Sequence, residues 1–202
     1  MQMTLQFLGA TEEVTGSCHL LTVAGKQMLL DCGLIQGGKA DELRNHEPFS
    51  FDPLAISAVV LSHAHIDHSG RLPLLVKAGY TGPIFTHKAT AELCAIMLKD
   101  AAMLQVRDTE RTNKKRAKHE LELLEPLFTV EDAEQAITQF VSLEYGQVTR
   151  VIPHVDICLS DAGHILGSAL VELWLGEGKA QKKLVFSGDL GRAGMPILRN
   201  PT

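Results

Sequence analysis

Apolar positions in this chain gather into short runs that Gly, Pro or polar residues separate. Runs of this length, rich in β-branched residues, predict strands. The predicted strands are Leu5–Leu8, His19–Val23, Gln27–Asp31, Ile56–Leu61, Ile84–Thr86, Val151–Ile152, Ile157–Leu159, Ser168–Leu175 and Leu184–Phe186. The run Ile56–Leu61 is apolar almost throughout, which is typical of a strand buried on both faces. We expect Leu184–Phe186 to be a central strand of its sheet.

Helical spacing is found in the middle of the chain. Apolar positions over Ala91–Leu104 recur at intervals of three and four residues, which predicts a helix. Thr129, followed by acids at Glu131 and Asp132, predicts a second helix start. Residues 33–53 are polar, with Gly and Pro, and predict a loop. Strands that alternate with helices indicate an α/β fold.

A dense group of metal-binding side chains follows the predicted strand Ile56–Leu61. Within six residues the chain carries His63, His65, Asp67 and His68. Alternate residues of an extended segment point to the same side, so His63 and His65 can bind one ion together. Asp67 and His68 lie where the chain turns into a helix and can face a second ion. Imidazole and carboxylate ligands suit zinc, iron or manganese. A merely polar surface loop is the alternative interpretation.

Two further candidates for metal binding stand at the ends of later predicted strands. His164 ends the sequence Asp-Ala-Gly-His, and Asp189 ends Ser-Gly-Asp. Each follows small residues that let the backbone approach another segment closely. The other histidines stand alone, which is more typical of packing or of surface positions, and they are His19, His46, His87, His119 and His154.

The composition limits the class of protein. The chain has 202 residues and a formal net charge of −5, which argues against a domain that holds nucleic acid by bulk charge alone. Bound metal ions would supply positive charge locally. No apolar run is long enough to span a membrane, and the first residues lack the features of a signal peptide. Four scattered cysteines indicate buried thiols. We therefore expect a cytoplasmic protein.

One segment departs from this acidic balance. Residues 107–118 contain six basic side chains, which are Arg107, Arg111, Lys114, Lys115, Arg116 and Lys118. A run of this kind is usually the solvated face of a helix, and the nearby acids temper its charge. Contact with RNA is the alternative interpretation.

The motifs resemble those of a known family. His-Ala-His-Ile-Asp-His is similar to the HxHxDH motif of the metallo-β-lactamase superfamily, and Asp31, His164 and Asp189 resemble its other motifs in the same order. The phrase DAGHILGSA resembles the β-CASP branch, the RNA-processing nucleases that include the cleavage-and-polyadenylation endonuclease and ribonuclease J. LVFSGDLGR and LGATEEVTGSCHLL also resemble this branch, so the resemblance covers nearly the whole chain.

The resemblance implies a fold and roles for the candidate residues. The fold would be the αββα sandwich, present here as its N-terminal portion over residues 1–202. His63, His65 and His164 would hold a first zinc, Asp67 and His68 a second, and Asp189 would bridge both. Asp31 would orient a ligand or the nucleophilic water, and Asp67 would also accept a proton. The catalytic residues would therefore be Asp67 and Asp31, with a metal-bridging hydroxide as the nucleophile.

The resemblance implies hydrolysis of single-stranded RNA, by endonuclease or exonuclease action, in RNA processing or decay. Two alternatives stay open. One is a hydrolase of the same fold that acts on a thioester, a lactone or a small phosphoester, and the other is a non-catalytic scaffold of an RNA-processing complex. The resemblance also implies partner proteins of RNA processing, and the sequence does not determine the oligomeric state.

The chain also departs from the family pattern. Full-length members insert a β-CASP domain after the strand that leads to Asp189 and then complete the first domain. We expect this chain to be truncated before that domain, with a complete first metal site and a weakened second one. We therefore expect little or no nuclease activity from these residues alone.

Overall fold

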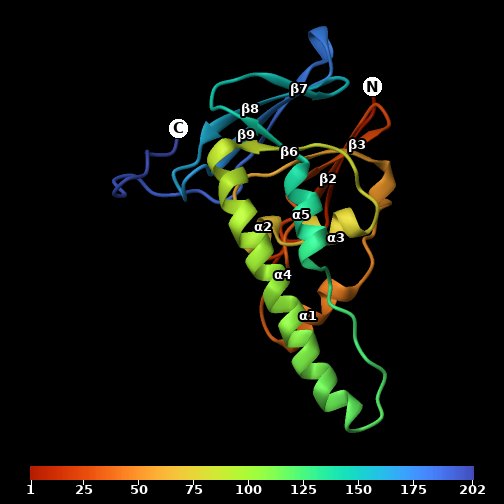
Figure 1. Cartoon of the computed structure of the whole chain (residues 1–202). Helices are drawn as coiled ribbons and strands as arrows, with labels where there is room; N and C mark the ends of the chain where they lie inside the picture. The colour runs from red at the N-terminus through yellow and green to blue at the C-terminus, as the bar shows by residue number, and fades with distance from the viewer.

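The computed structural model describes residues 1–202 and contains two β-sheets with helices on one side (Figure 1). The first sheet has the strand order β1-β2-β3-β4-β5-β6, and the second has the order β10-β9-β8-β7. The strands are β1 Met3–Phe7, β2 His19–Val23, β3 Lys26–Leu30, β4 Ile56–Val60, β5 Ile84–His87, β6 Phe140–Leu143, β7 Thr149–Ile152, β8 Val155–Asp161, β9 Ala169–Leu175 and β10 Lys182–Phe186.

The helices follow the parallel part of the first sheet. They are α1 Lys39–Leu43, α2 Ile66–Ser69, α3 Leu72–Lys77, α4 Lys88–Ala117 and α5 Val130–Thr138, with short 3₁₀ turns at Arg44–His46, Pro53–Ala55 and Gly178–Ala180. Strands β1 to β3 pair antiparallel, whereas β3 to β6 pair parallel and need crossover connections. The loops after the parallel strands therefore meet at one edge of the sheet. None of the helices combines the length and the apolar composition that a membrane-spanning segment requires.

Alternate side chains of the first sheet enter two separate cores. Leu20, Leu29 and Val59 pack toward the helices with Leu98 and Phe128. Their neighbours along the strands, among them Leu21, Leu30 and Val60, pack instead against β8 and β9 of the second sheet. This period of two is what a sheet covered on both faces requires. The layers are therefore helices, sheet and sheet, which matches the expected α/β sandwich, and no helix covers the outer face of the second sheet within residues 1–202.

Most predicted elements are confirmed, and three differ. Residues 33–53 are not entirely loop, because they contain α1 and the 3₁₀ turn Arg44–His46, and a second 3₁₀ turn begins at Pro53. The helix predicted at Ala91–Leu104 runs from Lys88 to Ala117, because the charged residues that follow are good helix formers. The strand at Leu184–Phe186 is not central: β10 pairs only with β9 and forms an edge of its sheet.

The predicted start of α5 is confirmed in detail. The hydroxyl of Thr129 accepts a hydrogen bond from the backbone N–H of Asp132 at 3.3 Å, and the carboxylate of Asp132 accepts one from the Thr129 N–H at 2.8 Å. This reciprocal capping box satisfies two backbone donors that the first turn leaves free. Helix α5 then packs between α3 and α4 (Figure 1).

Candidate metal centre

Loops from both sheets meet at one place. His63 and His65 follow β4, His164 follows β8, and Asp189 follows β10. Backbone hydrogen bonds hold these loops together: the N–H of Ala169 donates to the Ser62 carbonyl and the N–H of Gly191 donates to the Ala162 carbonyl, each at 2.9 Å. The two sheets thus supply ligands to a common centre, as a sandwich with strand-end loops on one edge allows.

A glycine makes the closest of these approaches possible. A Cβ atom on Gly33 would lie 1.6 Å from the carbonyl oxygen of Asp67, which no side chain can tolerate. The hydrogen bond from the Cys32 N–H to the His68 carbonyl, at 2.8 Å, fixes the same pair of segments. The segment after β3 therefore sits directly against the backbone of the histidine-rich loop.

Three imidazoles and one carboxylate converge in this centre. One ligand atom from each of His63, His65, His164 and Asp189 lies within 4.8 Å of all the others. Nδ1 of His65 is 3.1 Å from Nε2 of His63 and 3.2 Å from Nε2 of His164. Oδ2 of Asp189 is 3.8 Å from Nε2 of His63 and 3.5 Å from Nε2 of His164.

These separations suit a four-coordinate divalent metal. Four ligand atoms at about 2.0–2.1 Å from a zinc ion lie about 3.4 Å from one another in a tetrahedron. The histidines are also ready to act as ligands, because burial lowers the pKa of His63 to about 2, with the charges of His68, His65 and His164 adding to the effect. Burial and His164 likewise lower the pKa of His65. A neutral imidazole offers the lone pair that a metal needs.

A second group of possible ligands lies beside the first. Nε2 of His68 is 3.3 Å from Oδ1 of Asp189 and 3.8 Å from Oδ2 of Asp67. The two oxygens of Asp189 therefore face different groups, one toward His63 and His164 and the other toward His68. This second group offers three side chains where the first offers four.

Asp31 lies behind both groups and is completely buried. Its Oδ2 atom accepts hydrogen bonds from Nδ1 of His68 at 2.6 Å, from the Ser62 hydroxyl at 2.9 Å and from the Ser17 hydroxyl at 3.0 Å. Its Oδ1 atom accepts one from the Ser62 N–H at 2.8 Å. Four hydrogen-bond donors thus offset the free-energy cost of burying this carboxylate. Without such partners a buried charge would strongly destabilise the fold.

The hydrogen bonds of Asp31 set the tautomers of two histidines. Burial lowers the pKa of His68, but the hydrogen bond and charge of Asp31 and the charges of Asp189 and Asp67 raise it overall. The proton on Nδ1 of His68 points at Asp31, so its Nε2 faces the centre. Nδ1 of His63 lies 3.1 Å from the Ser62 hydroxyl, which itself donates to Asp31, and this leaves Nε2 of His63 free as well. Such partners fix ligand orientation.

The structure thus brings together all six predicted ligand residues and places Asp31 behind them. Sequence reasoning missed Ser17 and Ser62, which complete the shell around Asp31. The available signal was the position of Ser62, directly between the buried strand β4 and His63.

The lone histidines lie outside this centre, as predicted. His19 is buried edge-on between the rings of Phe7 and Phe186. The ring of His87 stacks on Tyr145, and its Nδ1 accepts a hydrogen bond from the Ala89 N–H at the start of α4.

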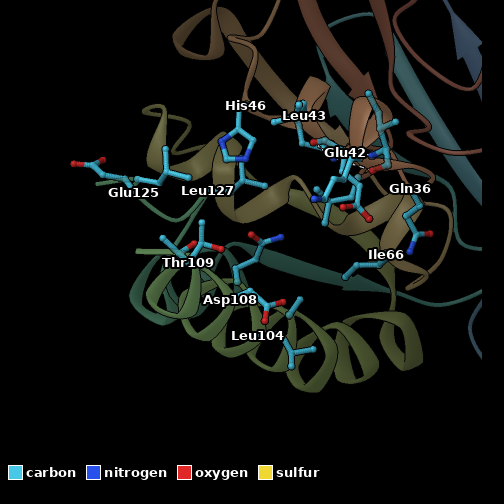
Figure 2. Close-up of a pocket in the computed structure, with 18 residues that line it drawn as sticks. Gln36, Glu42, Leu43, His46, Ile66, Leu104, Asp108, Thr109, Glu125 and Leu127 are labelled. Atoms are coloured by element: carbon cyan, nitrogen blue, oxygen red, sulfur yellow. Dashed lines mark hydrogen bonds between the residues drawn. The ribbon is translucent and has the colours of Figure 1, made fainter. Parts of the chain in front are cut away.

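A cavity of about 540 Å³ lies elsewhere, between α1, α4 and the segment 124–127 (Figure 2). It shares only Ile66 with the histidine-rich loop, and none of the six candidate ligands lines it. Its lining carries three acids, Glu42, Asp108 and Glu125, against one lysine, Lys39, so its net charge does not suit a phosphate.

Comparison with known protein families shows the family to which the chain belongs. Residues 11–165 match the model of the metallo-beta-lactamase superfamily, which is well over half of the chain. The chain belongs to this superfamily. The matched region contains five of the six candidate ligands, and only Asp189 lies beyond it.

The relatives of this metallo-beta-lactamase domain include a ribonuclease, a transcription termination factor and a subunit of the Integrator complex. The chain is 44% identical over 194 residues to Ribonuclease TTHA0252 of Thermus thermophilus, covering 96% of this chain and 39% of the relative. It is 34% identical over 190 residues to Transcription termination factor FttA of Methanothermobacter thermautotrophicus, with 92% and 27% covered. It is 31% identical over 189 residues to Integrator complex subunit 11 of Danio rerio, with 90% and 28% covered. These relatives agree with the predicted branch, and the chain spans less than two fifths of their length.

Solved structures agree on the metallo-beta-lactamase fold. A metallo-beta-lactamase of Cronobacter sakazakii with a HARLDQ motif superposes with a TM-score of 0.56 at 22% identity, covering 97% of this chain and 62% of that one. The metallo-beta-lactamase fold protein YhfI of Bacillus subtilis gives a TM-score of 0.53 at 19% identity, with 93% and 62% covered. At this identity the likeness concerns the fold alone.

Proposed function

We propose that this chain is the metal-binding domain of a zinc-dependent RNA phosphodiester hydrolase. The observation that carries the proposal is the convergence of three imidazoles and a carboxylate, from both sheets, on one point. The names of the relatives favour RNA as the substrate, since one is a ribonuclease and another a transcription termination factor.

His63, His65, His164 and Asp189 would hold a first divalent ion, and Asp67 and His68 would hold a second that shares Asp189. Zinc suits this donor set, and manganese or iron would also fit it. When bound, such ions supply positive charge for a phosphate and lower the pKa of water toward neutrality. Asp189 would bridge the two positions, because its two oxygens face different groups.

The chain's own residues have distinct tasks in this proposal. Asp31 holds His68 and, through Ser62, His63 with the correct nitrogen toward the centre. Asp67, whose Oδ2 lies 3.8 Å from Nε2 of His68, would accept the proton of the attacking water. Single-stranded RNA would lie across the open face, where Asp189 and His164 are partly exposed.

We expect weak hydrolysis by residues 1–202 alone. The second group has three ligand side chains, so it would hold an ion less tightly than the first. The cluster also lies open to solvent on the side of Asp189, whose side chain is 44% exposed. Partner proteins of RNA processing remain part of the proposal, since one relative is named as a subunit of a complex.

Hydrolysis of a labelled single-stranded RNA with added zinc or manganese tests the proposal. We expect slow cleavage that chelation abolishes and that His65→Ala removes. His119→Ala is the matched control, because His119 is exposed and distant from the cluster in sequence. Cleavage of a thioester but not of RNA would support the alternative hydrolase, and RNA cleavage that persists in His65→Ala would refute the assigned site.

A further inference from the structure

The second half of α4, together with Lys118 directly after it, carries a stripe of basic side chains. Arg107, Arg111, Lys114 and Lys118 follow one another at intervals of four, three and four residues. At 3.6 residues per turn, this spacing places them on one face of the helix. All four are exposed, and none takes part in an ion pair. The stripe is therefore a free cationic surface.

Two other sides of the same helix are occupied. Leu104, Asp108 and Thr109 line the cavity on one side (Figure 2). The returning segment covers another side, where the Asn113 side chain exchanges two hydrogen bonds of 2.8 Å with the backbone of Leu124. Arg116 lies on that side too, and its Nε donates to the Glu122 carbonyl at 2.5 Å. These contacts fix the orientation of α4 and leave the basic stripe turned to solvent.

The charge of this segment is opposite to that of the rest of the chain. Residues 107–118 contain six basic and two acidic side chains, while the remaining residues contain 13 basic and 22 acidic ones. The two acids are Asp108, which faces the cavity, and Glu110, which is exposed. A local concentration of positive charge on an acidic protein marks a surface for a polyanion.

Helix α4 also connects this stripe to the metal centre. At its first turn the Thr90 hydroxyl donates to the Gly167 carbonyl at 2.7 Å, and Gly167 belongs to the loop that carries His164. A rise of about 1.5 Å per residue places Arg107 about 26 Å and Lys118 about 42 Å from Thr90 along the axis. The basic end projects away from the sheets (Figure 1).

We propose that Arg107, Arg111, Lys114 and Lys118 bind the phosphate backbone of single-stranded RNA at a distance from the metal centre. The choice of RNA as the ligand rests on the proposed function. Helix α4 contains no aromatic residue on which a base could stack, so the contact is with phosphates and does not depend on the RNA sequence. The stripe holds a long RNA while another part of it lies at the centre.

Binding of RNA to the 202-residue chain tests this surface. The probe is a labelled phosphorothioate oligo(U) of about 30 nucleotides, longer than the ~4–16 nucleotides of a single site. The variant replaces Arg107, Arg111, Lys114 and Lys118 with Gln, which keeps helix propensity. A matched control replaces four exposed lysines elsewhere, Lys26, Lys39, Lys179 and Lys182, with Gln. Far-UV circular dichroism confirms that both retain the helices.

We expect the stripe variant to bind at least about tenfold more weakly at low salt and the control to bind nearly as the wild type. For single strands the slope of log K against log salt falls by about 0.7 per lost phosphate contact, so four contacts change it by about 3. Unchanged affinity and slope, or an equal loss in the control, would overturn the proposal. The proposal would also be overturned if the stripe variant lost affinity for poly-glutamate but not for RNA. That result would indicate an acidic protein partner.

The RNA-binding experiment and the hydrolysis experiment can fail independently of each other. A chain that binds RNA through the stripe but never hydrolyses it refutes the hydrolase alone. A chain that hydrolyses RNA while the stripe variant binds like the wild type refutes the stripe alone.

Discussion

The buried carboxylate of Asp31 accepts a hydrogen bond of 2.6 Å from the ring of His68. The same carboxylate accepts the Ser62 hydroxyl, which in turn contacts the ring of His63. One side chain therefore orients a candidate ligand in each of the two groups. Asp31 adopts a φ of +59°, a region that Asp tolerates better than most residues.

Replacing Asp31 with Asn should weaken metal binding. The side chains have nearly the same size, but an amide has lost the charge and one of its acceptor atoms. Loss of such a supporting partner typically lowers metal affinity about 10–100-fold. Competition with a chromogenic chelator measures the zinc affinity of each variant. Asp100→Asn, at an exposed position of α4, should bind zinc like the wild type, and equal affinity in Asp31→Asn would contradict the role given to this residue.

Replacing Gly33 with Ala should disturb the histidine-rich loop. The new methyl group would lie 1.6 Å from the Asp67 carbonyl oxygen, so the two segments must separate. We expect loss of the second ion first, because Asp67 and His68 contact this segment, and a lower melting temperature. Gly146→Ala is a useful comparison, since a Cβ atom there meets nothing within 4 Å, although its φ of +77° also adds strain. A Gly33→Ala protein with unchanged metal content would show that the close contact is dispensable.

The stability of the metal-free chain should fall with acidification. Burial is the main cause that lowers the pKa of four histidines, which are His19, His63, His65 and His87. Below the unfolded pKa of about 6.5 the unfolded chain binds more protons at these residues than the folded chain does. The free energy of unfolding therefore decreases as the pH falls. His68 opposes this trend, because its pKa is raised. Urea unfolding between about pH 7.5 and 5.5, around that unfolded pKa, measures the effect. Stability that rises on acidification would mean that His68 dominates.

Part of this molecule follows directly from local sequence patterns. The position of His63 and His65 after a buried strand was predictable, because β4 is apolar except for Ser57 and the histidine-rich segment follows soon after it ends. The capping box of α5 was predictable as well, since Thr129 and Asp132 have the required spacing.

Other features depend on contacts that are distant in the sequence. The shell of Asp31 joins Ser17, Ser62 and His68 from three segments, and no local pattern relates them. The edge position of β10 was not predictable either, because an apolar run says nothing about how many neighbours its strand has. The length of α4 depended on helix propensity in a segment without an apolar face, which periodicity cannot detect.

Metal content per chain is the most direct test of the central claim. Inductively coupled plasma mass spectrometry on protein purified without added zinc or chelator measures it. We predict about one tightly bound ion per chain, held by the four-ligand group, and a second ion only when zinc is added in excess. His65→Ala should lose the tightly bound ion, and His119→Ala should keep it. A wild-type chain that binds no metal even with added zinc, or a His65→Ala variant that keeps its full content, would contradict the assignment of this centre.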